Sequence, residues 1–403
     1  MTAAAPDSGR TLRASAVLSC AYFAAIGGFN PYAPLWYKEL GLPVFMIGVL
    51  VSLQSWTRLF APYAWGALAD RSGRRVSIIR WAALASCIAG FGFLLPADPL
   101  LLGAAVFLMF SFNAAIVPLT ETVVAAQLTD AEGRMDARRY GRVRVWGSVG
   151  FLASVVLAGW WYQWLGLRAF AATTVVLLAC VVLAAWSMPR SRAAVAAHEA
   201  GPPVGAVLRR PEVRWFFAGV FLTVLSHAAL YGFFSLYLDS LGYGKQTVGL
   251  LWAISVVMEI LWFAFQGRLL ESGTLHRWLL ASALLGALRF ALTAVGGASL
   301  ALLMLAQCLH AITFAVQHTA CIALIMRYFP GPLRGRGQAL YSVLGYGLSG
   351  VLGGLGGGWL AQQLGYASVF WVASAVALGG AACCWRSLRL ERREPSGPGA
   401  DQA

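Results

Sequence analysis

Charged side chains are scarce in this chain. Asp, Glu, Lys and Arg make up only 11% of the residues, whereas soluble domains contain about a quarter. Hydrophobic residues make up 59%, and Pro189–Pro211 is the only long polar break before the C-terminal tail. The shortage of charge excludes an ordinary soluble domain, and the long apolar runs predict a protein that spans a membrane.

Several signatures of catalysis are also missing. The sequence has no HExxH, no GxSxG and no glycine loop followed by Lys-Ser/Thr, which argues against an intramembrane enzyme or receptor. All seven cysteines fall inside the apolar runs, so an extracellular disulfide framework is not expected. The intramembrane histidines lack the i, i+3 or i, i+4 spacing of a metal site, and we expect neither a metal nor a cofactor.

The apolar residues form about twelve runs, each long enough to cross a hydrocarbon core of roughly 30 Å. The runs lie near 14–37, 45–68, 77–95, 100–127, 145–164, 168–188, 213–237, 247–267, 277–296, 299–326, 338–362 and 367–386. We therefore predict an all-α membrane protein with twelve transmembrane helices in two six-helix bundles. The eleventh run is dense in glycine, which indicates close helix packing.

The basic residues predict the orientation of these spans. Alternate loops carry nearly all of the Lys and Arg, and the opposite loops have only Lys38, Arg168 and Lys245. Because cytoplasmic loops are enriched in basic residues, both termini are expected in the cytoplasm. The net charge of +14 then reflects topology and lipid attraction rather than nucleic-acid binding.

The two halves of the chain resemble each other. Arg58 and Glu259 are single ionisable residues in the middle of apolar runs, and the offset between them also separates Leu40-Gly41 from Leu241-Gly242. A charge at the bilayer centre costs roughly 2.5–3.5 kcal/mol, so it usually has a functional reason. We predict an N-terminal bundle at 1–188, a linker at 189–211, a C-terminal bundle at 212–388 and a disordered tail at 389–403. Duplicated halves with a central site are typical of secondary transporters.

The loop after the second span contains GALADRSGRR, which begins at Gly66. Gly66 would permit close helix approach and Gly73 a tight turn, while Asp70 is a lone acid among Arg71, Arg74 and other basic residues. The alternative is a cytoplasmic loop that is basic only because of its orientation. This alternative explains the arginines, but it explains neither Asp70 nor the glycines. The motif predicts a gating loop.

Spans four and five supply a second group of polar residues. Asn113 and Glu121 share a helix face because they lie eight residues apart, and Pro118 between them is expected to kink the helix. Arg144, in YGRVRVWGSVGF, is the deeper of two neighbouring arginines and is the expected partner of Glu121. The alternative is that Glu121 lies near the cytoplasmic end and is simply solvated.

The second half contributes further candidates. Span ten carries His310, Gln317 and His318, and the spacing of seven places His310 and Gln317 on one face. Other polar and aromatic candidates are His227, Tyr231, Trp252, Glu259 and Arg289. Lone intramembrane histidines are often hydrogen-bonded packing residues, and that alternative stays open for His227 and His318.

Together, GALADRSGRR, YGRVRVWGSVGF, HAALYGFFSLY and QCLHAITFAVQH resemble the major facilitator superfamily, in particular its lactose-permease-like branch and the bacterial 3-phenylpropionic acid transporter group within it. In the sugar carrier, an acid on span four and an Arg on span five bind the sugar, and Glu121 and Arg144 resemble them. The acid of span eight, the Arg of span nine and the His of span ten resemble Glu259, Arg289 and His310. The family's proton-handling acid three residues after that His is replaced by Thr313, so the sugar mechanism does not transfer as a whole.

The duplicated halves and buried charges predict a secondary transporter, and the resemblance implies that it imports a small aromatic carboxylate with a proton by alternating access. The proton-coupling residues would be Glu259, Arg289 and His310. The substrate site would include Glu121, Arg144, Arg58, Asn113, His227, Tyr231, Gln317, His318 and Trp252. A proton-coupled sugar or nucleoside symporter and a drug efflux carrier are the alternatives. We expect a monomer in a bacterial inner membrane, with solute, protons and lipid as its partners and the proton gradient as its energy source.

Overall fold

The computed structural model of the chain describes residues 8–96, 98–129, 135–189, 204–270 and 275–392. Within these ranges, twelve helical segments are long and apolar enough to cross a membrane. The described residues contain no β-strand, and their one β-bridge joins Thr129 and Met135. The predicted all-α fold with twelve spans is therefore confirmed.

The first six spans contain the helices of the first half of the chain. These are α1 (Ser8–Phe29) with α2 (Ala33–Glu39), α3 (Val44–Arg58) with α4 (Ala61–Ser72), α5 (Arg75–Gly90) with η1 (Phe91–Leu94), α6 (Pro99–Asn113) with α7 (Ile116–Leu128), α8 (Ala137–Leu165), and η2 (Leu167–Ala169) with α9 (Phe170–Ser187).

The second half supplies the other six spans and a short helix before them. These are α10 (Gly205–Arg209), α11 (Pro211–Ser240), α12 (Lys245–Leu270), α13 (Leu275–Val295), α14 (Leu300–Cys308) with η3 (Ala311–Val316) and α15 (Gln317–Tyr328), η4 (Gly331–Leu333) and α16 (Arg334–Tyr341) with η5 (Ser342–Leu348) and α17 (Ser349–Leu364), and α18 (Tyr366–Glu391). The segments η3 and η5 are π-helical.

Prolines explain why two of the spans are broken in the first half. Pro62 follows the end of α3 at Arg58, and Pro118 follows the end of α6 at Asn113. A proline has no N–H to donate to the carbonyl four residues earlier, so the helix cannot run through without interruption. The kink expected from Pro118 is therefore confirmed, and Arg58 lies at the end of a helix rather than in its middle.

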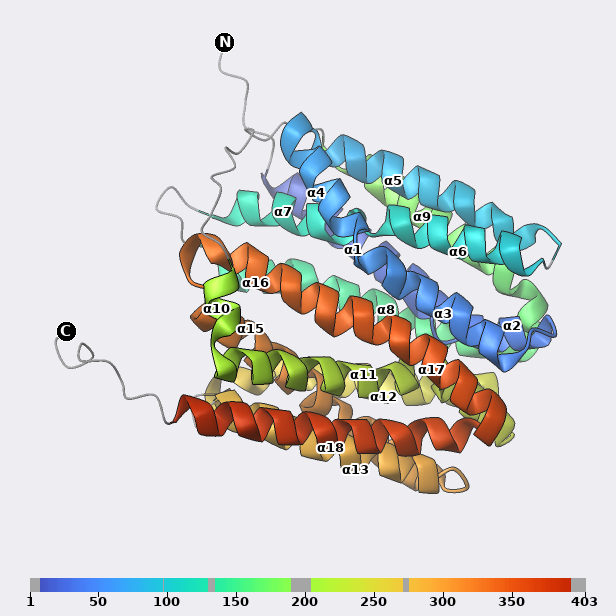
Figure 1. The fold of residues 1–403 in the computed structure, drawn as a ribbon. Helices are drawn as coiled ribbons and strands as arrows, with labels where there is room; N and C mark the ends of the chain where they lie inside the picture. The colour runs from blue at the N-terminus through green and yellow to red at the C-terminus, as the bar shows by residue number, and fades with distance from the viewer. Residues whose placement is uncertain (1–7, 97, 130–134, 190–203, 271–274, 393–403) are drawn as a thin grey trace, which may run out of the picture.

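Helices of each half pack mainly among themselves. In Figure 1 most of the first half (blue to green) lies above most of the second half (yellow-green to red), and α8 and α16 lie in the middle of the view. Within the first half α1 packs on α8, and within the second half α18 packs on both α11 and α13. The two halves meet along α3 with α17 and along α8 with α12. The start of α1 and the end of α18 lie at the same end of the molecule as α10 and α16 (Figure 1).

The backbone repeats the duplication seen in the sequence. Gly41 and Gly242 occupy equivalent places after α2 and α11, and both have left-handed backbones, with φ of 80° and 85°. Such φ values favour glycine. The next helices, α3 and α12, begin at the equivalent residues Val44 and Lys245. The loop between the first two spans of each half is thus built in the same way.

Glycines allow α3 and α17 to come together. A Cβ atom added to Gly358 would lie 3.1 Å from the Cα atom of Gly48, and one added to Gly354 would lie 2.9 Å from the carbonyl oxygen of Gly48. Small residues at membrane-helix crossings let the backbones approach closely. The close packing expected of the glycine-rich eleventh span is confirmed at this crossing.

The expected linker and tail fall largely outside the described residues. Of the linker at 189–211, residues 190–203 are not described, and α10 lies within the remainder. Of the tail at 389–403, residues 393–403 are not described. The helix α18 continues to Glu391, so the first residues expected in the tail are helical.

Many large apolar side chains point away from the core. Trp164 is 78% exposed and Trp81 65%, and further exposed tryptophans occur on α8, α17 and α18. In water such a surface would be unfavourable, whereas helices that are apolar on their outer faces are typical of membrane spans. The outer surface thus agrees with a lipid environment.

Candidate functional site

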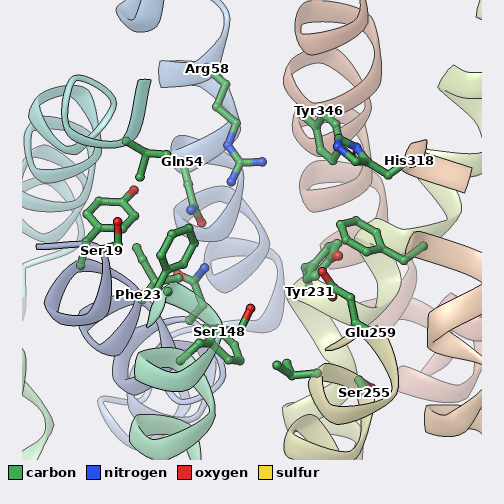
Figure 2. A pocket seen from close by; sticks show the side chains of 18 of the residues that line it. Ser19, Phe23, Gln54, Arg58, Ser148, Tyr231, Ser255, Glu259, His318 and Tyr346 are labelled. Carbon is green, nitrogen blue, oxygen red and sulfur yellow. The ribbon is translucent and has the colours of Figure 1, made fainter. Parts of the chain in front are cut away.

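A large cavity with a volume of about 1200 Å³ lies between the two halves. Figure 2 shows its two walls facing each other. One wall carries Ser19, Phe23, Gln54, Arg58 and Ser148, and the other carries Tyr231, Ser255, Glu259, His318 and Tyr346. Most of the lining is apolar or aromatic, and a few polar groups converge on it, which is the usual composition of a small-molecule site.

The cavity is open near the junction of α7 and α8. Glu121 and Arg144 line it there, and their side chains remain 43% and 62% exposed. The expected ion pair between Arg144 and Glu121 is present, and the hydroxyl of Tyr140 lies 3.4 Å from Nη1 of Arg144. The alternative of a Glu121 that is only solvated does not hold, although the pair is accessible to water.

The opposite end of the cavity is closed by contacts between the halves. Nζ of Lys38, at the end of α2, lies 2.7 Å from Oδ2 of Asp239, at the end of α11. Gln362 accepts a hydrogen bond from the backbone N–H of Phe45 across the α3–α17 crossing, with an N···O distance of 3.0 Å. Gln163 accepts one from the N–H of Lys245 across α8–α12, at 2.8 Å. At the other end the hydroxyl of Tyr63 donates to the carbonyl of Ala339 in the second half at 2.8 Å. The cavity is nevertheless reached from that end, where the lining residues Glu121 and Arg144 are exposed.

Most of the predicted site residues line this cavity. Those that do are Arg58, Glu121, Arg144, Tyr231, Trp252, Glu259, His310 and His318. Asn113, His227, Arg289 and Gln317 are not among the lining residues and are buried between helices. Ser86 donates a hydrogen bond to Oδ1 of Asn113 at 3.0 Å, and Nδ1 of His227 donates one to the carbonyl of Thr223 at 2.8 Å. The structure thus gives Asn113 and His227 packing partners inside their own half.

Arg58 differs from Arg144 and Arg289 in the partners of its guanidinium group. Its guanidinium carbon lies 5.9 Å from the centre of the Tyr346 ring, which belongs to the other half. Among the described residues no acidic side chain forms an ion pair with Arg58, whereas Arg144 has Glu121. Arg58 also lies at the C-terminal end of α3, where the helix dipole favours a positive charge. It is a cation held in the cavity without a counter-ion from the described residues.

Arg289 lies just behind the cavity wall and is fully buried, with 0% exposure. Its guanidinium donates to the carbonyl of Ala306 at 2.8 Å, to Oε1 of Gln307 at 3.0 Å and to the hydroxyl of Thr313 at 3.2 Å. Nη1 also lies 2.9 Å from Nδ1 of His310. Glu259 does not contact Arg289 directly, because His310 stands between them with Nε2 3.8 Å from Oε2 of Glu259.

Aromatic rings form much of the wall around Glu259. Tyr231 and Trp252 lie with ring centroids 6.1 Å apart, and the indole N–H of Trp252 donates to Ser235 at 3.2 Å. The rings of His310, Phe314 and His318 are stacked in a row, with interplanar angles of 6° and 14°. A ligand with an aromatic ring could make edge or stacking contacts with aromatic side chains on this wall.

Sequence reasoning missed Gln54 and Tyr346, which face each other across the cavity in Figure 2. Tyr346 lies in η5, within the glycine-rich eleventh span, and its hydroxyl is 3.2 Å from that of Tyr341 and 3.4 Å from Nδ1 of His318. A tyrosine among packing glycines could have been noticed as the polar group of that span. Gln54 offered a similar signal, four residues before Arg58.

The GALADRSGRR loop has the tight turn that the sequence predicted, but its first glycine does not lie against a neighbouring helix. Gly73 ends α4 with a φ of 63°, which confirms the tight turn, and Asp70 pairs with Arg75 at 3.0 Å. Arg71 and Arg74 are exposed. A Cβ atom on Gly66 would meet nothing within 4 Å, so the expectation that Gly66 permits close helix approach is wrong for this conformation.

Comparison with known proteins places these features in a family. The model of the MFS_1 like family matches residues 16–372. The chain belongs to this family. It is 32% identical to the probable 3-phenylpropionic acid transporter of Escherichia coli (strain K12), over 89% of the chain and 93% of that protein. It is 25% identical to the maltose permease of Geobacillus stearothermophilus, over 85% of each.

Solved structures show the same fold. The nucleoside transporter NupG superposes with a TM-score of 0.81 at 16% identity, over 94% of this chain and 99% of that one. A bacterial homologue of the lysosomal transporter Spinster, in an inward-facing and unoccupied conformation, superposes with a TM-score of 0.70 at 14% identity, over 98% and 100%. The chain is therefore a multi-pass membrane protein and a secondary transporter of the major facilitator type, not an enzyme.

Proposed function

We propose that this transporter is a proton-coupled symporter that imports a small aromatic carboxylate by alternating access. The observation that carries the proposal is Arg58, a cation that lines the cavity and has no acidic partner among the described residues. A buried or half-buried charge is expected to be paired. A carboxylate on the substrate would supply the missing partner through a bidentate hydrogen bond.

The other two arginines are less suited to this role. Arg144 is already paired with Glu121, so a substrate would have to compete with that carboxylate. Arg289 is fully buried behind His310 and is held by four neighbouring groups. Of the three candidate arginines from the sequence, Arg58 is the one that lines the cavity without an ion pair to a described acidic residue.

An aromatic ring suits the wall opposite Arg58. The row of His310, Phe314 and His318, and the pair of Tyr231 and Trp252, line the cavity. Stacking and edge contacts with aromatic side chains are worth about 0.5–1.5 kcal/mol beyond the burial of area. The probable 3-phenylpropionic acid transporter, with 32% identity, has a solute of this chemistry in its name.

Glu259 supplies the coupling to protons. An ionised Glu259 would repel the carboxylate of a substrate in the same cavity, whereas a protonated Glu259 would not. Binding of the proton and of the anion therefore favour each other, and the effect is reciprocal. This mutual effect lets one proton and one anion load cooperatively.

The direction of opening follows from the basic loops. The cavity opens at the end that carries the loop of Arg71 and Arg74 and the start of α8. If this arginine-rich end is cytoplasmic, the structure is an inward-facing state. We place the protein in a bacterial inner membrane as a monomer, with bundles at 1–188 and 212–388 that move about the cavity.

Binding to the purified protein tests the substrate class. We expect 3-phenylpropionate to bind roughly ten- to a hundredfold more tightly than its neutral amide, because a hydrogen bond to a charged group contributes about 1.5–3 kcal/mol. The measurement is titration calorimetry, with thermal stabilisation by the ligand as a second readout. Equal binding of acid and amide would contradict a role for the carboxylate.

Neutral solutes provide the competing outcome. The maltose permease relative, at 25% identity, makes a sugar the second candidate, and maltose and uridine belong in the same titrations. Binding of either one without binding of the acid would favour the neutral-solute symporter. Binding of several unrelated dyes would favour efflux.

A further inference from the structure

Arg289 determines which nitrogen of His310 carries a proton. A guanidinium has only donors and stays protonated in proteins. Nη1 of Arg289 lies 2.9 Å from Nδ1 of His310, so Nδ1 must accept the hydrogen bond. The single proton of a neutral imidazole is therefore on Nε2.

A second proton on His310 would break this arrangement. It would place an N–H of the ring against an N–H of Arg289, and two cations would lie side by side in a buried site, since Arg289 is 0% and His310 5% exposed. The other partners of Arg289, namely Ala306, Gln307 and Thr313, are neutral and offset no extra charge. As long as the Arg289 contact persists, His310 stays neutral.

The ring of His310 is also fixed in orientation. Phe314 stacks on it with centroids 5.1 Å apart and an interplanar angle of 6°, and His227 lies 6.3 Å away, centroid to centroid. The protonated Nε2 faces Oε2 of Glu259 at 3.8 Å. Because Arg289 fixes one nitrogen, the other always presents a donor to Glu259.

Of the acids that line the cavity, one has no described arginine as an ion-pair partner. The acids among its described lining residues are Glu121 and Glu259, and Glu121 is paired with Arg144. The charged and titratable groups that face Glu259 are His310 from span ten, Arg144 from α8, Tyr231 from α11 and Tyr346 from η5. His318 is held by Tyr341, with 3.1 Å between Nδ1 and the hydroxyl oxygen.

We infer that His310 is a neutral positioning residue and that Glu259 alone takes up the transported proton. This inference rests on the proposed proton symport. The carboxylate of Glu259 gains a proton to become a carboxylic acid, and the N–H on Nε2 of His310 favours its return to the ionised form in the empty, open cavity. Thr313 occupies the place of an acid in the sugar carriers and takes up no proton in this cycle. Its hydroxyl accepts from Arg289 at 3.2 Å and donates to the carbonyl of His310 at 3.4 Å.

The protonation state of His310 can be observed without any substrate. Selective ¹⁵N labelling of the five histidines, with His310→Gln to assign the signal, distinguishes a protonated Nε2 and bare Nδ1 from an imidazolium. We expect the neutral pattern to persist between about pH 5 and pH 8, across the range in which an unperturbed histidine titrates. An imidazolium signal from His310 within that range would overturn the inference, whether or not the proposed substrate is right.

The pH profile of substrate binding separates positioning from proton uptake. In Glu259→Gln, affinity for 3-phenylpropionate should no longer depend on pH. In His310→Asn, which keeps an acceptor near Nδ1, and in His310→Gln, which keeps a donor near Nε2, the dependence should persist with a shifted midpoint. If both histidine variants lost the pH dependence and Glu259→Gln retained it, the transported proton would be assigned to His310.

Two controls complete this experiment. Glu39→Gln neutralises an exposed acid outside the cavity and should leave the wild-type profile unchanged. His318→Gln alters the aromatic wall, so weaker binding of 3-phenylpropionate is expected, but the affinity should still depend on pH. Loss of that dependence would place the proton on His318 and contradict the assignment to Glu259. If the wild type binds no carboxylate at any pH, the proposed function fails, while the labelled histidines still test the state of His310.

Discussion

At the scale of single residues, the position of Arg58 follows from a proline four residues later. Pro62 cannot donate to the carbonyl of Arg58, so α3 ends there and the side chain reaches into the cavity from a helix terminus. The guanidinium then lies near Tyr346 of the other half. A substrate anion at this point would touch both halves at once.

Substitutions of Arg58 test this role. Arg58→Gln removes the charge and should weaken binding of 3-phenylpropionate roughly ten- to a hundredfold, in line with about 1.5–3 kcal/mol for a charged hydrogen bond. Arg58→Lys keeps the charge but lacks the planar fork, so we expect a smaller loss. Titration calorimetry measures both. Arg10→Gln, at an exposed position, is the matched control, and unchanged affinity in Arg58→Gln would rule out Arg58 as the anchor.

The sequence identified many of the cavity residues for a simple reason. An ionisable residue within an apolar run, such as Arg58 or Glu259, is conspicuous because its burial in lipid is costly. The same reasoning selected Arg289 and His227, which lie inside a bundle rather than in the cavity. Helical periodicity shows which residues share a face, but it does not show whether that face meets a cavity or another helix.

At the scale of helices, a π-helix removed one residue from the predicted face of span ten. The spacing of seven placed His310 and Gln317 together, but η3 (Ala311–Val316) holds more residues per turn than an α-helix. His310, Phe314 and His318, which the sequence spacing also placed near one face, do align, whereas Gln317 turns into the bundle. Such a local change in helical pitch depends on tertiary packing and leaves no periodic pattern in the sequence.

The crossing of α3 and α17 offers a test within one helix. Gly354→Ala would place a methyl group 2.8 Å from Cβ of Ser52 and 2.9 Å from the carbonyl oxygen of Gly48. Overpacking of this kind costs about 1–3 kcal/mol, so we expect a lower melting temperature of the purified protein.

Gly356→Ala is the control for that change, because a Cβ there meets nothing within 4 Å. Alanine is favoured over glycine in a helix interior by roughly 0.5–1 kcal/mol, so this variant should be at least as stable as the wild type. Two alanines in the same helix are therefore expected to shift stability in opposite directions. Equal shifts of the melting temperature in the two variants would mean that the close crossing of α3 and α17 does not limit stability.

At the scale of the whole molecule, an ion pair at the closed end joins equivalent positions of the two halves. Lys38 and Asp239 have the same offset in sequence as Arg58 and Glu259, and they pair at 2.7 Å. Exposed pairs contribute only about 0–1 kcal/mol. We therefore expect Asp239→Asn to change the rate of uptake by at most about fivefold, and Lys38→Asp with Asp239→Lys to restore it. Complete loss of transport in Asp239→Asn would show that the pair has a larger role than closing this end.

The energetics of the whole transport cycle give the broadest test. A monocarboxylate that moves with one proton carries no net charge, whereas a neutral sugar or nucleoside with one proton carries one. A membrane potential is worth about 2.3 kcal/mol per charge per 100 mV, which is roughly a fiftyfold change in accumulation. Uptake of 3-phenylpropionate into vesicles should therefore follow an imposed pH gradient and be insensitive to a potential set by valinomycin. Accumulation that rises with voltage would mean that more than one proton moves with each anion or that the solute is neutral, because only a cycle with net charge can respond to the field.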